Sequence, residues 1–174
     1  NSNFNDFRQY SYVTPKLADI TTEQMNYLKS YVDSFENALA GPLYQDPDKG
    51  VRKFADLASF MDYFFVNEIS RNVDGYRLSS YFHQDRNSIN SKIKAGPVWD
   101  YDLAFRNADY CNGSYIQGWA YEFNNVCGGD QAGLIPFWWE KLMTDTAFVG
   151  GLRCAWKSQR LQSLSNNRFM AIID

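Results

Sequence analysis

The feature that most constrains the fold is a regular spacing of apolar residues in two segments of the first half of the chain. In residues 21–41, apolar side chains recur at steps of three and four, which predicts an amphipathic helix. Thr21 followed by Gln24 is a capping-box pattern at its start, and Gly41 stands where the pattern stops. Residues 54–72 repeat the spacing and predict a second helix. The apolar positions of the first segment are Met25, Leu28, Val32, Phe35 and Leu39.

Further along, the pattern changes from helix to strand and back. Residues 76–84 and 90–99 are typical of strands and are separated by turn residues, which predicts a β-hairpin. Residues 135–160 predict two helices with a break near Thr144, and residues 164–174 predict a last helix. The whole pattern indicates a mostly helical α+β fold with one small sheet.

Composition excludes several classes of protein. A chain of 174 residues fits one domain, and 45% hydrophobic residues supply a core and argue against disorder. The formal net charge is -3 and no run of Lys or Arg occurs, which argues against nucleic-acid binding. No apolar stretch approaches the roughly 18 residues of a membrane-spanning helix. The glycine-rich loops that hold nucleotide phosphates are also missing from the sequence.

The cysteines leave two alternatives open. Cys111 and Cys127 bracket much of a Gly- and Asn-rich segment, residues 108–134, which is predicted to be a long ordered loop or insertion. They can pair in an oxidising compartment, or they can be buried free thiols. With Cys154 they show no metal-ligand spacing, and the single histidine, His83, is predicted to be structural.

An acid lies on the apolar face of the second helix. Glu68 follows Leu57 by eleven residues, about three helical turns, so it projects along nearly the same line. One explanation is an ion pair with a buried Arg, because an unpaired buried carboxylate is costly. The other is a functional carboxylate near a cleft.

Two more acids stand in an apolar neighbourhood, in the segment Gly-Pro-Val-Trp-Asp-Tyr-Asp that follows the hairpin. In an extended segment, Asp100 and Asp102 point to the same side, an arrangement that suits a hard cation such as Mg²⁺ or Mn²⁺. Val98, Trp99 and Tyr101 are expected to anchor the segment in the core. The alternatives are that these acids only form a turn, or that they belong to a paired-carboxylate glycosidase, for which nothing singles out two acids.

The order of these motifs resembles the core of the CotH family, the atypical kinases similar to spore coat protein H. The family's hallmark is Asn-Glu, then Asn-x-Asp-Gly, then a hairpin, then Gly-Pro-x-Trp-Asp-[Phe/Tyr]-Asp. Here the first two begin at Asn67 and Asn72, and the last spans residues 96–102. The likeness is specific over roughly residues 50–110 and looser on either side.

The resemblance implies a fold like the helical lobe of a kinase, and transfer of a phosphoryl group from ATP to Ser or Thr of secreted or surface proteins with Mg²⁺ or Mn²⁺. Asp74 then occupies the catalytic-loop position, with Asn72 and Glu68 as supporting catalytic candidates. Asp100 and Asp102 are the metal candidates. Such a protein works outside the cytoplasm and acts on a protein substrate or another cell-surface component.

One departure from the family concerns the residues after these acids. The family usually has Gly-Asn there, and this chain has Arg106 followed by Asn107, the candidate for cofactor binding. A kinase also needs a nucleotide-binding lobe, which the residues before Gly50 are too few to form. Residues 1–174 are therefore expected to be one domain, the C-terminal lobe of a longer protein, and inactive on their own.

The aromatic residues suggest a different class of function, a non-catalytic binding module of a surface protein, with glycans as one class of ligand. Exposed rings would form a platform for sugars, whereas the alternative is that the same rings lie in the core. The candidates are Trp119, Tyr121, Phe123, Trp138 and Trp139. Convergence of Glu68, Asp74 and Asp100 in one open cleft would favour the enzyme, whereas a separate Arg partner for each acid would favour a structural role.

Overall fold

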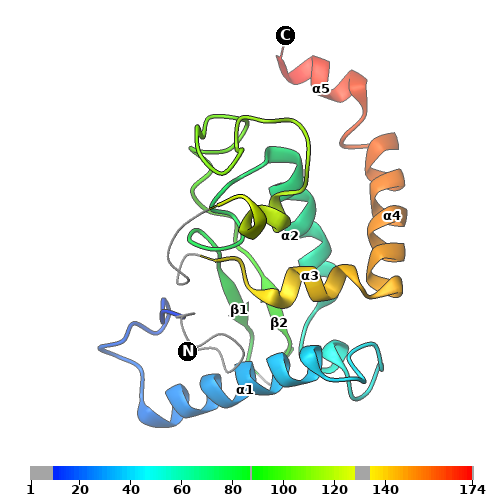
Figure 1. Ribbon diagram of the computed structural model, residues 1–174. Helices are drawn as coiled ribbons and strands as arrows, with labels where there is room; N and C mark the ends of the chain where they lie inside the picture. Colours follow the sequence, from blue (N-terminus) through cyan, green and yellow to red (C-terminus); the bar gives the residue numbers. More distant parts are fainter. Residues whose placement is uncertain (1–9, 87, 128–133, 174) are drawn as a thin grey trace.

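The computed structural model describes residues 10–86, 88–127 and 134–173. It confirms a mostly helical α+β fold with one two-stranded antiparallel sheet. In Figure 1, α1 crosses one end of the hairpin and α5 projects from the far end of α4. The elements in chain order are α1 (Thr22–Ala40), the 3₁₀ helix η1 (Val51–Lys53), α2 (Leu57–Ser70), β1 (Phe82–Gln84), β2 (Ile93–Ala95), the 3₁₀ helix η2 (Ala120–Asn125), α3 (Phe137–Met143), α4 (Thr146–Leu161) and α5 (Asn166–Ile173).

Helix α1 begins and ends as its sequence predicts. The Thr21 side chain accepts a hydrogen bond from the Gln24 backbone, and the Gln24 side chain accepts one from the Thr21 backbone, which completes the capping box. The helix packs on α3, where the ring of Phe35 meets Trp138 edge-on at 4.8 Å between centroids. Beside them the fully buried Glu36 accepts a hydrogen bond of 2.9 Å from the Trp138 indole, so this buried acid, which its sequence neighbours do not reveal, is structural.

The core is built around the aromatic rings that α2 and α3 bring together. Trp139 is fully buried, with its ring 5.5 Å from Phe60, 5.9 Å from Tyr63 and 4.7 Å from Tyr76 between centroids. Trp138 is buried as well. This tryptophan pair therefore forms the core, and a sugar platform built on it is wrong.

The hairpin is present but shorter than the sequence predicts. Its register pairs Phe82 with Ala95 and Gln84 with Ile93. The residues before β1 form turns instead of a longer strand, because the Asp74 carbonyl accepts hydrogen bonds from the backbone N–H groups of residues 77, 78 and 79. On β1, the His83 ring contacts the Gly96 carbonyl at 3.1 Å, in keeping with a structural histidine.

The second half of the chain contains the predicted helices and a disulfide. The helical break falls at Asp145, whose side chain accepts from the N–H groups of residues 147 and 148 and so caps α4. Cys111 and Cys127 are joined by a disulfide, which resolves the alternative left open by the sequence. The predicted insertion over residues 108–134 contains η2, and its residues 128–133 lie outside the described structure. Within the described residues, no helix has the length and apolarity needed to cross a membrane.

Candidate active site at the end of helix α2

The first part of the site is the loop that follows α2. The helix ends at Ser70, and Arg71 adopts a left-handed conformation with φ 50°, which turns the chain back on itself. The Asn72 side chain then accepts a hydrogen bond of 3.2 Å from the backbone N–H of Asp74. This bond holds the backbone before Asp74, and the hydrogen bonds from residues 77–79 to the Asp74 carbonyl hold the backbone after it. The carboxylate is therefore fixed from both sides.

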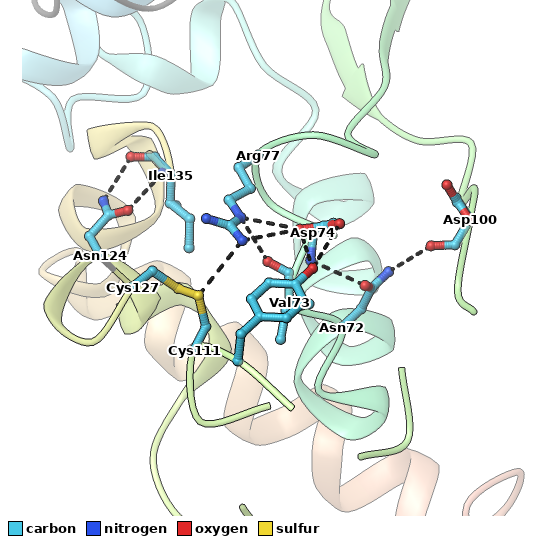
Figure 2. A network of polar contacts seen from close by, with 10 residues as sticks. Asn72, Val73, Asp74, Arg77, Asp100, Cys111, Asn124, Cys127 and Ile135 are labelled. Atoms are coloured by element: carbon cyan, nitrogen blue, oxygen red, sulfur yellow. Dashed lines mark hydrogen bonds and ion pairs between the residues drawn. A yellow bond between two sulfur atoms is a disulfide. The ribbon is translucent and has the colours of Figure 1, made fainter. Parts of the chain in front are cut away.

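Asn72 also joins this loop to the second acidic segment. Its side-chain amide nitrogen donates a hydrogen bond of 3.2 Å to the Asp100 carbonyl, and the residue is fully buried. Figure 2 shows Asn72 lying between Asp74 and Asp100. Because both ends of its amide bind backbone, Asn72 is placed to hold the two loops together rather than to reach a ligand.

Asp100 and Asp102 lie on an exposed turn, so the burial cost suggested by their apolar neighbours does not arise. The expectation of an extended segment is wrong, since Asp100 has φ 61° in the left-handed region. The kink still brings the two carboxyl groups together. Asp102 raises the pKa of Asp100, first through a hydrogen bond between their side chains and then through its charge, and the charge of Asp74 adds to the effect. The negative charges of Asp74 and Asp102 therefore both act on Asp100.

The anchoring of this segment differs from the prediction. Val98 is 51% exposed and Trp99 is 62% exposed, so neither lies in the core. Only Tyr101 points inward, and its hydroxyl donates a hydrogen bond of 3.0 Å to the Asn67 side-chain oxygen. Asn67 is fully buried in α2. In the sequence, the only sign that it supports Tyr101 is a polar residue among the apolar residues of the helix.

The Asp74 carboxylate has two neighbours that sequence reasoning missed. Arg77 forms an ion pair with it at 3.2 Å, and the Tyr110 hydroxyl lies 3.4 Å from its second oxygen. Arg77 follows Asp74 by three residues, and the turn between them brings the two side chains into contact. Tyr110 comes from the distant loop and has no local signal.

Glu68 does not join this group. One carboxylate oxygen accepts a hydrogen bond of 2.8 Å from the Ala120 N–H, and the other accepts from the Tyr121 N–H at 3.0 Å and the Tyr76 hydroxyl at 2.9 Å. Burial raises the pKa of Glu68, and these hydrogen bonds and the nearby Arg71 charge partly oppose the rise. The acid thus binds the N-terminus of η2, and its contacts match neither a buried ion pair nor a cleft carboxylate.

The remaining candidate, Asn107, is next to the acidic turn. Its side-chain nitrogen donates a hydrogen bond of 2.6 Å to the Asp102 carbonyl, so it braces the second acid. Arg106 has φ 71°, a left-handed conformation that glycine adopts more readily than other residues. The Arg106 side chain donates a hydrogen bond of 2.6 Å to the Ser114 carbonyl.

The acidic turn offers only part of the oxygen ligand set that a hard cation requires. Among the described residues, no group of three or more His, Cys, Asp or Glu side chains is arranged to hold a metal on its own. Mg²⁺, however, is commonly bound by one or two carboxylates together with substrate phosphates and water. The exposed Asp100 and Asp102 pair fits that shared mode of binding.

Fold and site together define a class of protein: a mostly helical α+β domain in which Asn72 joins the post-helix loop that carries Asp74 to the post-hairpin turn that carries Asp100 and Asp102. The family model described as CotH kinase protein matches residues 1–174, the whole chain. The chain belongs to this family, as the motifs indicate. Searches of curated proteins and of solved structures found no significant match.

Proposed function

We propose that this chain carries the catalytic acids of a metal-dependent protein kinase that transfers a phosphoryl group from ATP to Ser or Thr of secreted or surface proteins. The observation that carries the proposal is the Asn72 bridge, which holds the Asp74 loop and the Asp100 turn side by side. Phosphoryl transfer depends mainly on positioning and on neutralisation of charge, and rigidly held acids supply the first of these.

The three acids then have different roles. Asp74 orients the substrate hydroxyl and accepts its proton, because it is the acid held by the loop after α2 and fixed by Arg77. Asp100 and Asp102 would hold the cation together with the ATP phosphates. When bound, the cation supplies charge neutralisation at those phosphates. Asn72 and Asn107 act through the backbone of the two acidic segments.

The disulfide supports a location outside the cytoplasm. Cys111 and Cys127 are bonded in the structure, and such bonds persist mainly in oxidising compartments. A secreted or surface-exposed kinase acting on extracytoplasmic proteins is consistent with that chemistry.

Binding and transfer test the proposal in the protein that carries this chain. Isothermal titration with Mn²⁺ and ATP, followed by a phosphate-transfer assay on a Ser- and Thr-containing protein, should show binding and turnover. Asp100→Ala should lose both, because it removes one of the two carboxylates on the acidic turn. Asp48→Ala, at an exposed turn outside the site, is the matched control and should retain both. Equal binding and transfer in wild type and Asp100→Ala would overturn the proposed function.

A further inference from the structure

The Asp74 carboxylate is held from one side by a single guanidinium group. The Arg77 Nε and Nη2 atoms lie 3.3 and 3.2 Å from the same oxygen of Asp74. The Nε group also donates to the Val73 carbonyl at 3.0 Å, which fixes the guanidinium relative to the loop backbone. Both side chains are largely buried, with 11% of Arg77 and 15% of Asp74 exposed. Arg77 therefore holds one oxygen of Asp74, and the Tyr110 hydroxyl lies 3.5 Å from that oxygen and 3.4 Å from the second.

Behind Arg77 lies the disulfide. The Arg77 Nη2 atom contacts the Cys111 sulfur at 3.8 Å, and Cys111 is bonded to Cys127. Figure 2 shows this line of contacts from Asp74 through Arg77 to the two cysteines. Cys127 is buried two residues after η2 ends, and its backbone N–H donates a hydrogen bond of 2.7 Å to the Phe123 carbonyl of η2, so the disulfide fixes Cys111 to a packed element. The residue before Cys111 is Tyr110, the other neighbour of Asp74.

We propose that Arg77 is the positioning residue for Asp74 and that the Cys111–Cys127 disulfide, by backing the guanidinium, makes this positioning depend on the oxidation state of the protein. The inference rests on the proposed function, in which Asp74 receives the substrate proton. It adds a device that the catalytic acids alone do not supply: a covalent bond behind the site that keeps Arg77 and Tyr110 against one carboxylate.

Reduction removes that support in a defined reaction. A dithiol such as dithiothreitol gives two electrons and two protons to the disulfide, the S–S bond breaks, and two thiols form while the dithiol closes to a cyclic disulfide. Cys111 is then no longer tied to a residue 16 positions away. Its sulfur leaves its fixed place against Arg77, and the Asp74 side chain gains other orientations.

The expected effect falls on turnover rather than on substrate binding. A misplacement of about 1 Å at a reacting group can reduce the rate about a hundredfold. Arg77→Met should therefore lower kcat by about a hundredfold while KM stays within about twofold, and Arg77→Lys should recover part of the loss by restoring the charge without the fork geometry. A purely structural role would predict the same kcat per folded molecule in all three proteins.

The redox part is tested with cysteine variants of the same protein. Dithiothreitol should lower wild-type kcat to the level of the double variant Cys111→Ser/Cys127→Ser and should not change the double variant further. Cys154→Ser is the matched control, because Cys154 is an exposed free thiol on α4, and it should respond to the reductant as wild type does. An unchanged kcat in reduced wild type, with near-ultraviolet circular dichroism showing a folded protein, would overturn the inference.

A second measurement separates this inference from the proposed function. The Arg77 Nε–H resonance, assigned by its loss in Arg77→Lys, should shift in nuclear magnetic resonance spectra when wild type is reduced, and should stay fixed in the reduced double variant. This readout needs no catalysis. If wild type transfers no phosphate but the resonance shifts, the proposed function fails and the coupling of Arg77 to the disulfide stands. If the resonance does not move, the coupling itself is wrong.

Discussion

Gly75 is the residue at which three parts of the site come into contact. A Cβ atom added there would lie 1.8 Å from the side-chain oxygen of Asn67, well inside any allowed contact. That oxygen also accepts the hydrogen bond from Tyr101. The missing side chain thus allows the Asp74 loop to pack on α2 while α2 holds the acidic turn, which explains a glycine directly after the catalytic candidate.

Gly75→Ala should therefore destabilise the protein. We expect a loss of at least about 2 kcal/mol in the free energy of unfolding, because neither the Asn67 side chain nor the loop can shift without breaking buried hydrogen bonds. Urea denaturation would measure it. Gly150→Ala is the control, since nothing lies within 4 Å of a Cβ there and alanine in α4 should stabilise by about 1 kcal/mol. Equal stability of Gly75→Ala and wild type would contradict the packing argument.

At the scale of elements, one side chain connects α2 to η2. The Glu68 carboxylate accepts hydrogen bonds from the backbone N–H groups of Ala120 and Tyr121. These are two of the donors that the start of a helix leaves without partners. Glu68 lies 52 residues before Ala120 in the sequence, so the contact joins the helix that ends at the site to the loop that carries the disulfide.

This connection should give the protein a pH dependence. Burial raises the folded-state pKa of Glu68 above the ordinary 4.5, so between the two values the folded state binds more protons than the unfolded state. The contribution of Glu68 to stability should therefore fall as pH rises through that window and stay low above it. The difference in free energy of unfolding between wild type and Glu68→Gln, measured by urea denaturation across pH, should fall in the same direction.

Tyr76→Phe provides a matched comparison for this prediction. The Tyr76 hydroxyl donates a hydrogen bond to Glu68 and lowers its folded-state pKa, so the variant should raise the upper limit of the window while the lower limit, set by the unfolded state, stays in place. A pH profile that is identical in Glu68→Gln and wild type would show that the carboxylate is not buried as described.

Elements whose signals are local were predictable from the sequence. The capping box at Thr21, the cap at Asp145 and the apolar spacing of α2 are each complete within a few residues. The length of the hairpin was not predictable, because the backbone N–H groups of residues 77–79 donate to the Asp74 carbonyl and form a turn where the sequence pattern predicts a strand. The role of Glu68 was also out of reach, since its partners come from a loop without periodicity.

The same distinction applies to the site within the whole molecule. The ordered motifs make Asp74, Asp100 and Asp102 candidates, and in the structure Asp102 and the charge of Asp74 both raise the pKa of Asp100. The contacts that fix them depend on tertiary structure: Asn67 reaches Tyr101 across 34 positions, and Arg77 reaches Cys111 across another 34. No spacing rule in a single sequence reports such contacts, so the partners of these supporting residues came only from the structure.

The paired acids should also make the stability of the whole molecule depend on divalent cations. A ligand that binds only the folded state at a concentration of about 100 times its Kd adds about 2.7 kcal/mol. For a chain of this length, that amounts to an increase in Tm of roughly 5–10 °C. Mn²⁺ should therefore raise the Tm of wild type, and ATP should enlarge the increase, because a two-carboxylate site leaves coordination positions for phosphate oxygens.

Removal of one negative charge at the same turn should also affect the stability of the metal-free protein. Asp102 raises the pKa of Asp100, so repulsion between the two carboxylates is present in the metal-free protein and Asp100→Asn relieves it. In EDTA this variant should melt no lower than wild type, and it should lose the Mn²⁺ response measured by differential scanning fluorimetry. Asp48→Asn, with the same change of charge at an exposed turn, should keep that response. A full Mn²⁺ shift in Asp100→Asn would place the cation elsewhere, whereas loss of the shift together with a raised metal-free Tm would identify repulsion at this turn as what the cation relieves.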